Sequence, residues 1–203
     1  MLLAMTMFQT VDGVMQGPGG PDEDRGDDFN RGGWLAPHFD EETGRYVTDA
    51  FNRADAFLLG RNTYDIFAAY WPLVTDPDDP IASRLNSQQK YVASTTLTDP
   101  PWERTTVLSE DIPAAVAHLK SQPGGELQIH GSASLVRSLH ERDLIDEYRL
   151  LTFPVILGEG RRLFADRGVD TGLELTDSRV TDSGVSINVY RPTGRPEYGE
   201  AGS

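Results

Sequence analysis

The sequence contains no cysteine, which excludes a disulfide framework, a thiolate metal site and a cysteine nucleophile. Basic residues are scarce as well: 18 Lys and Arg stand against 32 Asp and Glu, and the formal net charge is −14. Because binding to a nucleic-acid backbone needs a basic face, this charge argues against a nucleic-acid partner. It still allows a small phosphorylated ligand, provided that a few arginines gather in one pocket.

The sequence also lacks a hydrophobic run long enough to cross a membrane. Its apolar opening, Met1–Phe8, covers eight residues, whereas a membrane-spanning helix needs about 20. No basic residue precedes this run and Gln9 begins a polar stretch, which is not the pattern of a secretory signal. We therefore expect a buried first strand, and a cytoplasmic protein with no membrane partner.

Strand-like apolar runs alternate with helical segments along the chain. The predicted strands are Leu2–Phe8, Ala56–Leu59, Lys90–Ala93, Leu127–Ile129, Tyr148–Phe153, Leu173–Val180 and Val185–Tyr190. The predicted helices are Glu41–Asn52, Thr63–Ala69, Ile112–Lys120 and Ser132–Glu141. This alternation predicts an α/β fold of three layers, with helices on both faces of a mixed, mostly parallel central sheet and a C-terminal antiparallel hairpin.

Polar segments mark the expected loops and the end of the domain. Residues 193–203 are rich in glycine and contain little to bury, so we predict one domain over residues 1–192 followed by a disordered tail. The acidic stretch Gly17–Asp28 is a long loop after the first strand, and such loops often act as lids. Asp76, Asp78 and Asp79 lie among prolines and are interpreted as a solvated loop.

The end of the second predicted strand combines features of an anion site. Gly60 permits a tight turn, Arg61 adds a positive charge, and Thr63 can cap the helix that follows. Free amides at a helix N-terminus attract anions, so this segment is a candidate for phosphate binding. The alternative interpretation is an ordinary capped helix with a surface arginine.

Two further strands end in small or hydroxyl-bearing residues. Ser94 and Thr95 follow the strand Lys90–Ala93, where they can bind phosphate or ribose or simply form a turn. After the strand Leu127–Ile129, a helix is expected to open at Gly131, Ser132 and Ala133. Because parallel strands end at the same edge of a sheet, we expect these turns to line one trough with Gly60 and Arg61.

A possible proton donor stands before the first predicted helix. A carboxyl group of Asp40 close to Trp34 has its charged form disfavoured, which raises its pKa toward useful acid chemistry. The alternative is that Asp40 is the N-cap of the helix, a position that aspartate prefers. The four histidines lack the spacing of metal ligands, so we expect no metal site, and we expect His130 to be packed or hydrogen-bonded.

Taken together, these segments resemble the dihydrofolate reductase superfamily, and within it the C-terminal reductase domain of the riboflavin-biosynthesis deaminase/reductase, RibD. The most specific segment is Leu144–Phe164, a long strand followed by Gly-x-Gly-x-x-Leu-Phe. Thr10–Gly13, Gly60–Thr63 and Gly131–Leu135 also match the pattern, and the resemblance covers about residues 2–192.

The resemblance implies a homodimeric NADPH-dependent reductase. NADPH would lie across the strand ends, with its adenosine phosphates on Arg61 and Thr63, assisted by Ser94 and its neighbour Thr95. Its pyrophosphate would lie on Gly131–Ala133.

The same resemblance assigns the substrate side of the site. Asp12 and the loop 13–21 would flank the nicotinamide and the substrate, with Trp34 nearby, Asp40 supplying a proton and Asp12 orienting. Asp40 stands one residue later than the carboxylate of the dihydrofolate reductase pattern Trp-x-x-Pro-x-Asp/Glu. The implied reaction is hydride transfer to a C=N or C=O bond of a small pterin-like or pyrimidine ribosylamine-like heterocycle, such as 5-amino-6-(5-phosphoribosylamino)uracil.

Two other classes of function remain open from the sequence. The same fold can hold a nucleotide without turnover, as a binding or dimeric structural protein. It can also serve as a dimeric interaction module, with Leu144–Phe164 as its apolar interface.

Overall fold

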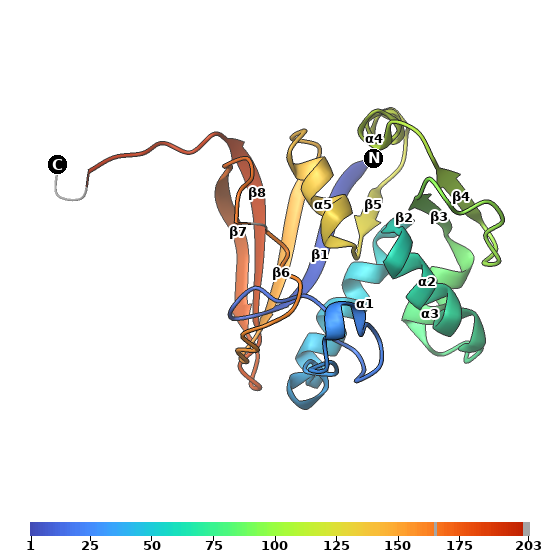
Figure 1. The fold of residues 1–203 in the computed structure, drawn as a ribbon, viewed down its shortest axis with the longest axis horizontal. Helices are drawn as coiled ribbons and strands as arrows, with labels where there is room; N and C mark the ends of the chain where they lie inside the picture. Colours follow the sequence, from blue (N-terminus) through green and yellow to red (C-terminus); the bar gives the residue numbers. More distant parts are fainter. Residues whose placement is uncertain (165, 201–203) are drawn as a thin grey trace.

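A mixed sheet of eight strands runs through the centre of the computed structural model, which describes residues 1–164 and 166–200. The strand order is β4-β3-β2-β5-β1-β6-β8-β7 (Figure 1). The strands are β1 (Leu2–Thr10), β2 (Ala54–Gly60), β3 (Gln89–Ala93), β4 (Thr105–Leu108), β5 (Glu126–Ile129), β6 (Glu147–Phe153), β7 (Gly172–Val180) and β8 (Ser186–Gly194). Neighbours from β4 to β6 pair in parallel, and β8 pairs antiparallel with β6 and β7, which confirms the predicted class.

Helices cover both faces of the sheet and complete three layers. They are α1 (Glu41–Asn52), α2 (Arg61–Tyr70), α3 (Pro80–Ser87), α4 (Ile112–Ser121) and α5 (Ala133–His140), with short 3₁₀ turns η1 (Gly26–Asp28), η2 (Ala36–His38) and η3 (Trp71–Leu73). None of the helices described is long and apolar enough to cross a membrane.

Alternation along β2 divides the buried side chains between two cores. Phe57 and Leu59 pack in a core with residues of α1, α2 and α3. Ala56 and Leu58 pack in a second core with residues of α4 and α5. Because successive side chains of a strand point to opposite faces, a strand that is hydrophobic throughout serves both cores at once.

Besides the short 3₁₀ turns, the described structure contains a strand, β4, and a helix, α3, that the sequence analysis did not predict. β4 is only four residues long and polar at its start, so it carries little periodic signal. α3 begins inside the segment interpreted as a solvated loop. Asp79 caps this helix by accepting hydrogen bonds from the amides of Ile81 and Ala82, both at 2.9 Å, and Pro80 occupies its first position.

The C-terminal segment begins within the sheet. Thr193 and Gly194, the first residues of the expected tail, belong to β8. Arg195 then donates to both carboxylate oxygens of Asp143, at 3.1 and 2.9 Å, and Tyr198 donates to Asp170 at 2.6 Å. Figure 1 shows the chain leaving the body of the molecule after β8. Residues 201–203 of the expected tail lie outside the described residues.

Much of the segment Leu144–Phe164, which one hypothesis makes an apolar interface, lies within the fold. Its strand, β6, lies inside the sheet between β1 and β8. Ile145, Leu151 and Leu163 are buried in the two cores. Ile156 and Phe164 are exposed, at 71% and 43%, so the hypothesis of an apolar interface on this segment stays a prediction.

The cap of α3 yields a prediction for stability. Replacing Asp79 with alanine leaves two amides of the first helical turn without their acceptor, so we expect Asp79→Ala to lower the free energy of unfolding by about 1 kcal/mol. Urea denaturation measures the loss. Asp78→Ala is the matched control, because the Asp78 side chain accepts no hydrogen bond within the part of the chain described. Equal losses in the two variants would contradict the assignment of the cap.

Candidate functional site

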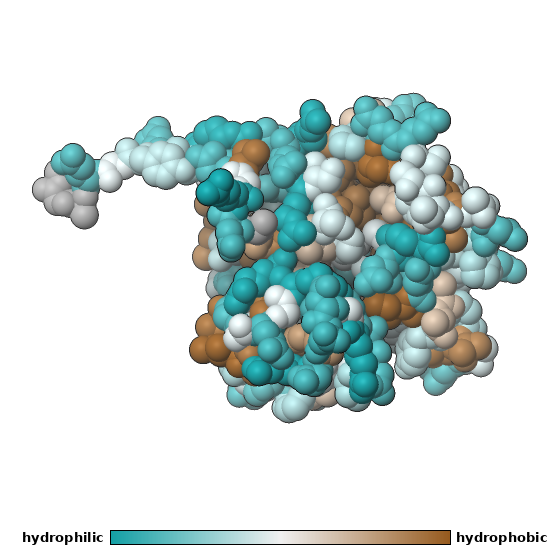
Figure 2. Space-filling view, in the orientation of Figure 1, coloured by the Kyte–Doolittle hydropathy of each residue, from teal (hydrophilic) through white to brown (hydrophobic). Residues whose placement is uncertain are grey.

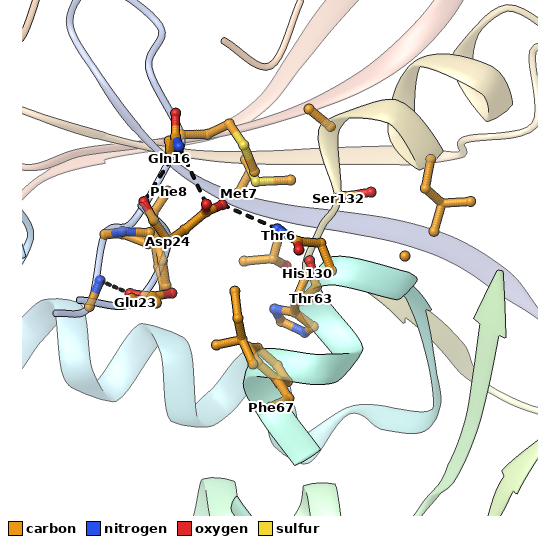
Figure 3. Close-up of a pocket in the computed structure, with 18 of the residues that line it drawn as sticks. Thr6, Met7, Phe8, Gln16, Glu23, Asp24, Thr63, Phe67, His130 and Ser132 are labelled. Atoms are coloured by element: carbon orange, nitrogen blue, oxygen red, sulfur yellow. Dashed lines mark hydrogen bonds between the residues drawn. The ribbon is translucent and has the colours of Figure 1, made fainter. Parts of the chain in front are cut away.

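A pocket of about 890 Å³ lies at the carboxyl ends of the parallel strands. Gly60 at the end of β2, Ala93 at the end of β3 and His130 just after β5 line it, together with residues 6–8 of β1. Figure 3 shows Gln16, Glu23 and Asp24 on one side of the pocket and Thr63 and His130 on the other. The turns after β2 and β5 therefore line one cavity, whereas from the turn after β3 only the preceding Ala93 reaches it.

The helices that open on this pocket differ at their N-termini from the other helices. α1, α3 and α4 begin at Asp40, Asp79 and Asp111, and each of these carboxylates accepts a hydrogen bond from a first-turn amide. α2 begins after Gly60 and α5 after Ser132, and neither has a side-chain cap. The first-turn residues of both helices line the pocket, so their amides are free to bind an anion.

Glycine brings these two helix starts together. The amide of Gly60 donates to the carbonyl oxygen of Gly131 at 3.0 Å. A Cβ atom at Gly60 would lie 2.3 Å from Ser132 Oγ and 2.9 Å from Ser132 N. At Gly131, where φ is +124°, it would lie 2.6 Å from Thr63 Oγ1. No side chain fits at either position, so glycine is required for the close contact.

Several predicted cofactor residues lie at this junction. Gly60, Arg61, Thr63, Ser132 and Ala133 all line the pocket. Thr63 lies within the first turn of α2, so the expectation that it caps the helix is wrong: the helix begins earlier, at Arg61. Gly131 supports the pocket from behind through its contacts with Gly60 and Thr63, without lining it.

Arg61 is held at the rim by two partners. Its Nε donates to both carboxylate oxygens of Asp65, at 2.9 and 2.8 Å, and one terminal nitrogen donates to Thr96 Oγ1 at 3.1 Å. The side chain is still 40% exposed, so the guanidinium can reach a ligand. Ser94 and Thr95 do not line the pocket. Ser94 closes the turn after β3 by accepting hydrogen bonds from two amides, and Thr95 is exposed.

Asp40 does not lie in the pocket. Its Oδ1 accepts hydrogen bonds from the amide and the hydroxyl of Thr43, at 2.8 and 2.7 Å, and Oδ2 accepts from the amide of Ser183 at 3.1 Å. The Thr43 hydrogen bonds, which favour the ionised form, hold the pKa of Asp40 below its ordinary value. A low pKa does not suit a proton donor, so this prediction is corrected: Asp40 is the N-cap of α1.

Asp12 and Trp34 fasten loops instead of lining the pocket. Partial burial alone raises the pKa of Asp12, but hydrogen bonds from Thr10 and from the amides of Gly158 and Leu157 lower it to about 2. These bonds tie the loop after β1 to the loop after β6. The Trp34 indole is buried in the core and donates to the carbonyl oxygen of Gln16 at 2.8 Å. Neither side chain reaches the ligand space directly.

The acidic loop brings two carboxyl groups to the pocket that the sequence analysis did not single out. Burial, together with the nearby charge of Asp24, raises the pKa of Glu23, against the effect of hydrogen bonds from the amides of Gly19 and Gly20. Burial acts in the same direction on Asp24, but hydrogen bonds from Arg161 and Gly26 lower its pKa below the ordinary value. Only a model of how the loop folds back could have identified Glu23.

Contacts across the pocket mouth hold this loop in place. Asn62, in the first turn of α2, donates to Asp24 Oδ2 at 3.2 Å. Arg161 pairs with Asp24 and, at 2.8 Å, with Asp27. On the face of the molecule seen in Figure 2, hydrophilic residues gather over this loop. Whether the loop opens and closes as a lid stays a prediction.

His130 lies half-buried in the pocket wall, stacked on Phe51 with ring centroids 4.4 Å apart. Burial, reinforced by the charge of Arg149, lowers its pKa to about 3, so the ring is neutral at neutral pH. Its Nε2 lies 3.1 Å from Gln128 Oε1. The Gln128 amide nitrogen already donates to the carbonyl oxygen of Ala50 and to Glu126, both at 2.6 Å, so Oε1 must accept the proton of His130 Nε2.

The remaining wall of the pocket is apolar and aromatic. α1 contributes Val47 and Phe51, α2 contributes Ile66 and Phe67, and η3 contributes Trp71. Within the described chain, no group of three or more histidine and acidic side chains is arranged to hold a metal ion. The pocket thus joins a polar half, at two helix starts, to an apolar half suited to a flat ring.

The sheet order, the parallel strands and the C-terminal hairpin define a dihydrofolate reductase-like fold. A putative riboflavin biosynthesis protein from Shewanella sp. PV-4 shares it, with a TM-score of 0.67 at 22% identity over 95% of this chain and 99% of that one. Dihydrofolate reductase from Enterococcus faecalis, complexed with NADP(H), gives a TM-score of 0.58 at 13% identity over 95% of this chain and 96% of that one.

The sequence places the chain within one family of that fold. Residues 2–187 match the RibD C-terminal domain, and the chain belongs to this family. The uncharacterized protein YyaP of Bacillus subtilis (strain 168) is 34% identical over 149 residues, which cover 72% of this chain and 79% of YyaP. Family and fold together support a reductase.

Proposed function

We propose that this protein is an NADPH-dependent reductase that transfers hydride to a C=N or C=O bond of a small heterocycle. The observation that carries the proposal is the pair of helices, α2 and α5, that open on one pocket without side-chain caps while α1, α3 and α4 have aspartate caps. Free amides at two adjacent helix starts suit the phosphates of a dinucleotide. The cytoplasmic location expected from the sequence stays a prediction.

The residues at the junction fit NADPH by their chemistry. Ser132 and Ala133 would hold the pyrophosphate against the start of α5, where glycine at position 131 lets the chain come close. Arg61 would hold the 2′-phosphate, as the only cation in the first turn of α2. The likeness of the fold to a dihydrofolate reductase complexed with NADP(H) supports this assignment.

When bound, the nicotinamide supplies the hydride, and the chain must position the acceptor and provide a proton. We assign the proton to Glu23, because it lines the pocket and burial raises the pKa of its carboxyl group. The apolar wall formed by Phe51, Phe67 and Trp71 would hold the acceptor ring and exclude water from it.

Removal of Arg61 tests the cofactor site. We expect Arg61→Ala to weaken NADPH binding by about 10-fold or more and NADH binding by less than about 2-fold, because only NADPH carries the 2′-phosphate. Calorimetric titration measures both. Arg45→Ala is the matched control, since Arg45 forms the same kind of exposed pair with a carboxylate four residues away on α1 and does not line the pocket. Equal losses for the two nucleotides would refute the role.

A conservative change at Glu23 tests the proton donor. We expect Glu23→Gln to lower kcat about 100-fold with little change in NADPH affinity, because the amide cannot supply a proton. The decline of the unmodified enzyme's rate as pH rises through the raised pKa of Glu23 should disappear in the variant. The assay follows NADPH oxidation with pterins, pyrimidine ribosylamines and uncharged bicyclic heterocycles as acceptors.

Asp28→Asn provides the control for Glu23, since Asp28 is exposed on the same loop and does not line the pocket. An unchanged pH profile in Glu23→Gln would contradict the assignment. NADPH binding without oxidation for any acceptor would instead favour a nucleotide-binding protein without turnover.

We also propose that two chains associate through the edge strand β7. Apart from the half-buried Gly172, every residue of this strand is exposed. The exposed side chains include Leu173, Leu175 and Val180, at 42%, 52% and 68% exposure. An edge strand with exposed apolar side chains is a ready surface for pairing or packing with a second copy.

Light scattering tests the association. We expect a particle of twice the 22.4 kDa chain mass, and Leu175→Arg should shift it to the mass of one chain by placing a charge in the contact. Leu73→Arg is the control, because Leu73 is 78% exposed in η3, away from the sheet edge. A monomer in the unmodified protein would disprove the dimer.

A further inference from the structure

Two residues of the pocket lining, Thr6 on β1 and His130 just after β5, each have a polar side-chain atom without a hydrogen-bond partner in the described chain. Thr6 Oγ1 is buried and makes no hydrogen bond, although Thr6 lines the pocket and is only 3% exposed. Within the described residues, the hydrogen bond of the His130 ring is at Nε2 and none is made at Nδ1. A buried hydroxyl without a partner, such as that of Thr6, is rare in folded proteins and calls for an explanation.

Strand register places these two residues side by side. β1 pairs in parallel with β5, with Met5 opposite Ile129, so Thr6 and His130 are the next neighbours along the same two strands. Met5 and Ile129 pack in the core beneath α4 and α5, so the residues that follow them face the opposite side, toward the pocket. Figure 3 shows the two labelled side chains next to one another.

The two atoms have complementary hydrogen-bonding roles. Because Gln128 fixes the His130 proton on Nε2, Nδ1 presents a lone pair and can only accept. A chain of hydrogen bonds fixes the orientation of the Gln128 amide. Arg149 donates to both oxygens of Glu126, at 2.9 and 2.8 Å, and Glu126 in turn accepts from Gln128. The Thr6 hydroxyl can donate. The wall therefore offers one acceptor beside one donor.

We propose that Thr6 and His130 together recognise the cyclic amide edge of a planar heterocycle. The ring N–H would donate to His130 Nδ1, and the adjacent C=O would accept from Thr6 Oγ1. This inference deepens the proposed function and rests on it, because it assigns the two side chains that would recognise the N–H and C=O edge of the reductase's acceptor.

The surroundings of the pair suit an uncharged ring. α1, η3 and α3 supply only Val47, Phe51, Trp71 and Ile81 to the pocket. The lining cations have other roles: Arg61 is assigned to the phosphate of the cofactor. Arg161 pairs with two loop carboxylates, and Arg137 donates to backbone carbonyls in the loop after β6. Aromatic walls around one donor and one acceptor bind flat rings with a defined edge.

The test uses two bicyclic probes that differ at one nitrogen. Quinazolin-4(3H)-one carries the N–H and C=O edge, and 3-methylquinazolin-4(3H)-one has a methyl group in place of the hydrogen. Titration followed by tryptophan fluorescence, in the presence of saturating NADPH, should show the first probe binding about 10-fold more tightly than the second. Equal affinities for the two probes, or no binding of the first, would overturn the inference.

Variants of each residue separate recognition from structure. Thr6→Val keeps the shape of the side chain and removes its hydroxyl, and should weaken the lactam about 10-fold, while Thr6→Ser should retain its affinity within about 2-fold. His130→Phe keeps the stacking on Phe51 and should abolish the preference for the unmethylated probe. A variant Thr6→Val that binds the lactam unchanged would disprove the role of the hydroxyl.

Thr105→Val is the matched control, because Thr105 Oγ1 on β4 is also buried without a partner but lies outside the pocket lining. We expect it to leave both affinities unchanged within about 2-fold. Nitrogen-15 NMR of the His130 ring gives an independent readout: Nδ1 should be the unprotonated nitrogen, and Gln128→Leu should release that preference.

The two proposals can fail separately. Failure of the unmodified protein to bind NADPH, measured without any probe, counts against the reductase. Normal NADPH binding with no discrimination between the two quinazolinones counts against the lactam site alone.

Discussion

The ends of β2 and β5 touch so closely that neither Gly60 nor Gly131 has room for a side chain, and the site depends on this contact. A single backbone hydrogen bond joins the two glycines. Because α2 follows β2 directly and α5 begins three residues after β5, the contact fixes the starts of the two helices beside each other, with their free amides facing one space. A larger side chain at either glycine would separate the strands and thereby the two anion-binding ends.

The acidic composition of the chain is balanced locally at this space. Glu23 and Asp24 approach the pocket from the loop, and Arg161 compensates Asp24 by pairing with it. The loop is also fastened at its start, where Gln16 donates to the carbonyl oxygen of Gly26 at 2.8 Å. The carboxyl groups of these two adjacent residues thus have pKa values shifted in opposite directions. Burial favours the neutral form of Glu23, whereas the hydrogen bond from Arg161 keeps Asp24 ionised.

Much of the fold could be predicted from the sequence, because hydrophobic patterns identify strands and helices that serve a core. The helix Glu41–Asn52 was predicted with its observed ends, and the mixed, mostly parallel sheet with its terminal hairpin is confirmed. α3 was missed because the residues that start it, Asp79 and Pro80, also favour loops. Which of these tendencies wins depends on packing, here on Ala82 and Leu85, which are buried.

Residues of the site could be predicted from the sequence only where their role depends on residues close to them in the chain. Glycine and arginine at the end of β2 directed attention to the correct edge of the sheet. For Asp40 the sequence left open a proton donor or an N-cap, and the local hydrogen bonds from Thr43 decide for the cap. The contact with Ser183, over a hundred residues away, cannot be read from its neighbours. The pairing of Thr6 with His130 depends on the register between two strands that are also far apart in sequence, and no periodicity along one segment specifies that register.

The missing caps of α2 and α5 have a thermodynamic consequence. At Gly60 no side chain fits, but an aspartate in the place of Ser132 could supply α5 with the acceptor that α1, α3 and α4 have, and a cap of this kind contributes about 1 kcal/mol. The protein therefore forgoes the stability of a cap at a helix start where a carboxylate would compete with a ligand's phosphates. Any anion that fills both helix starts should raise the melting temperature through mass action, more than its contact with the apolar wall alone would predict.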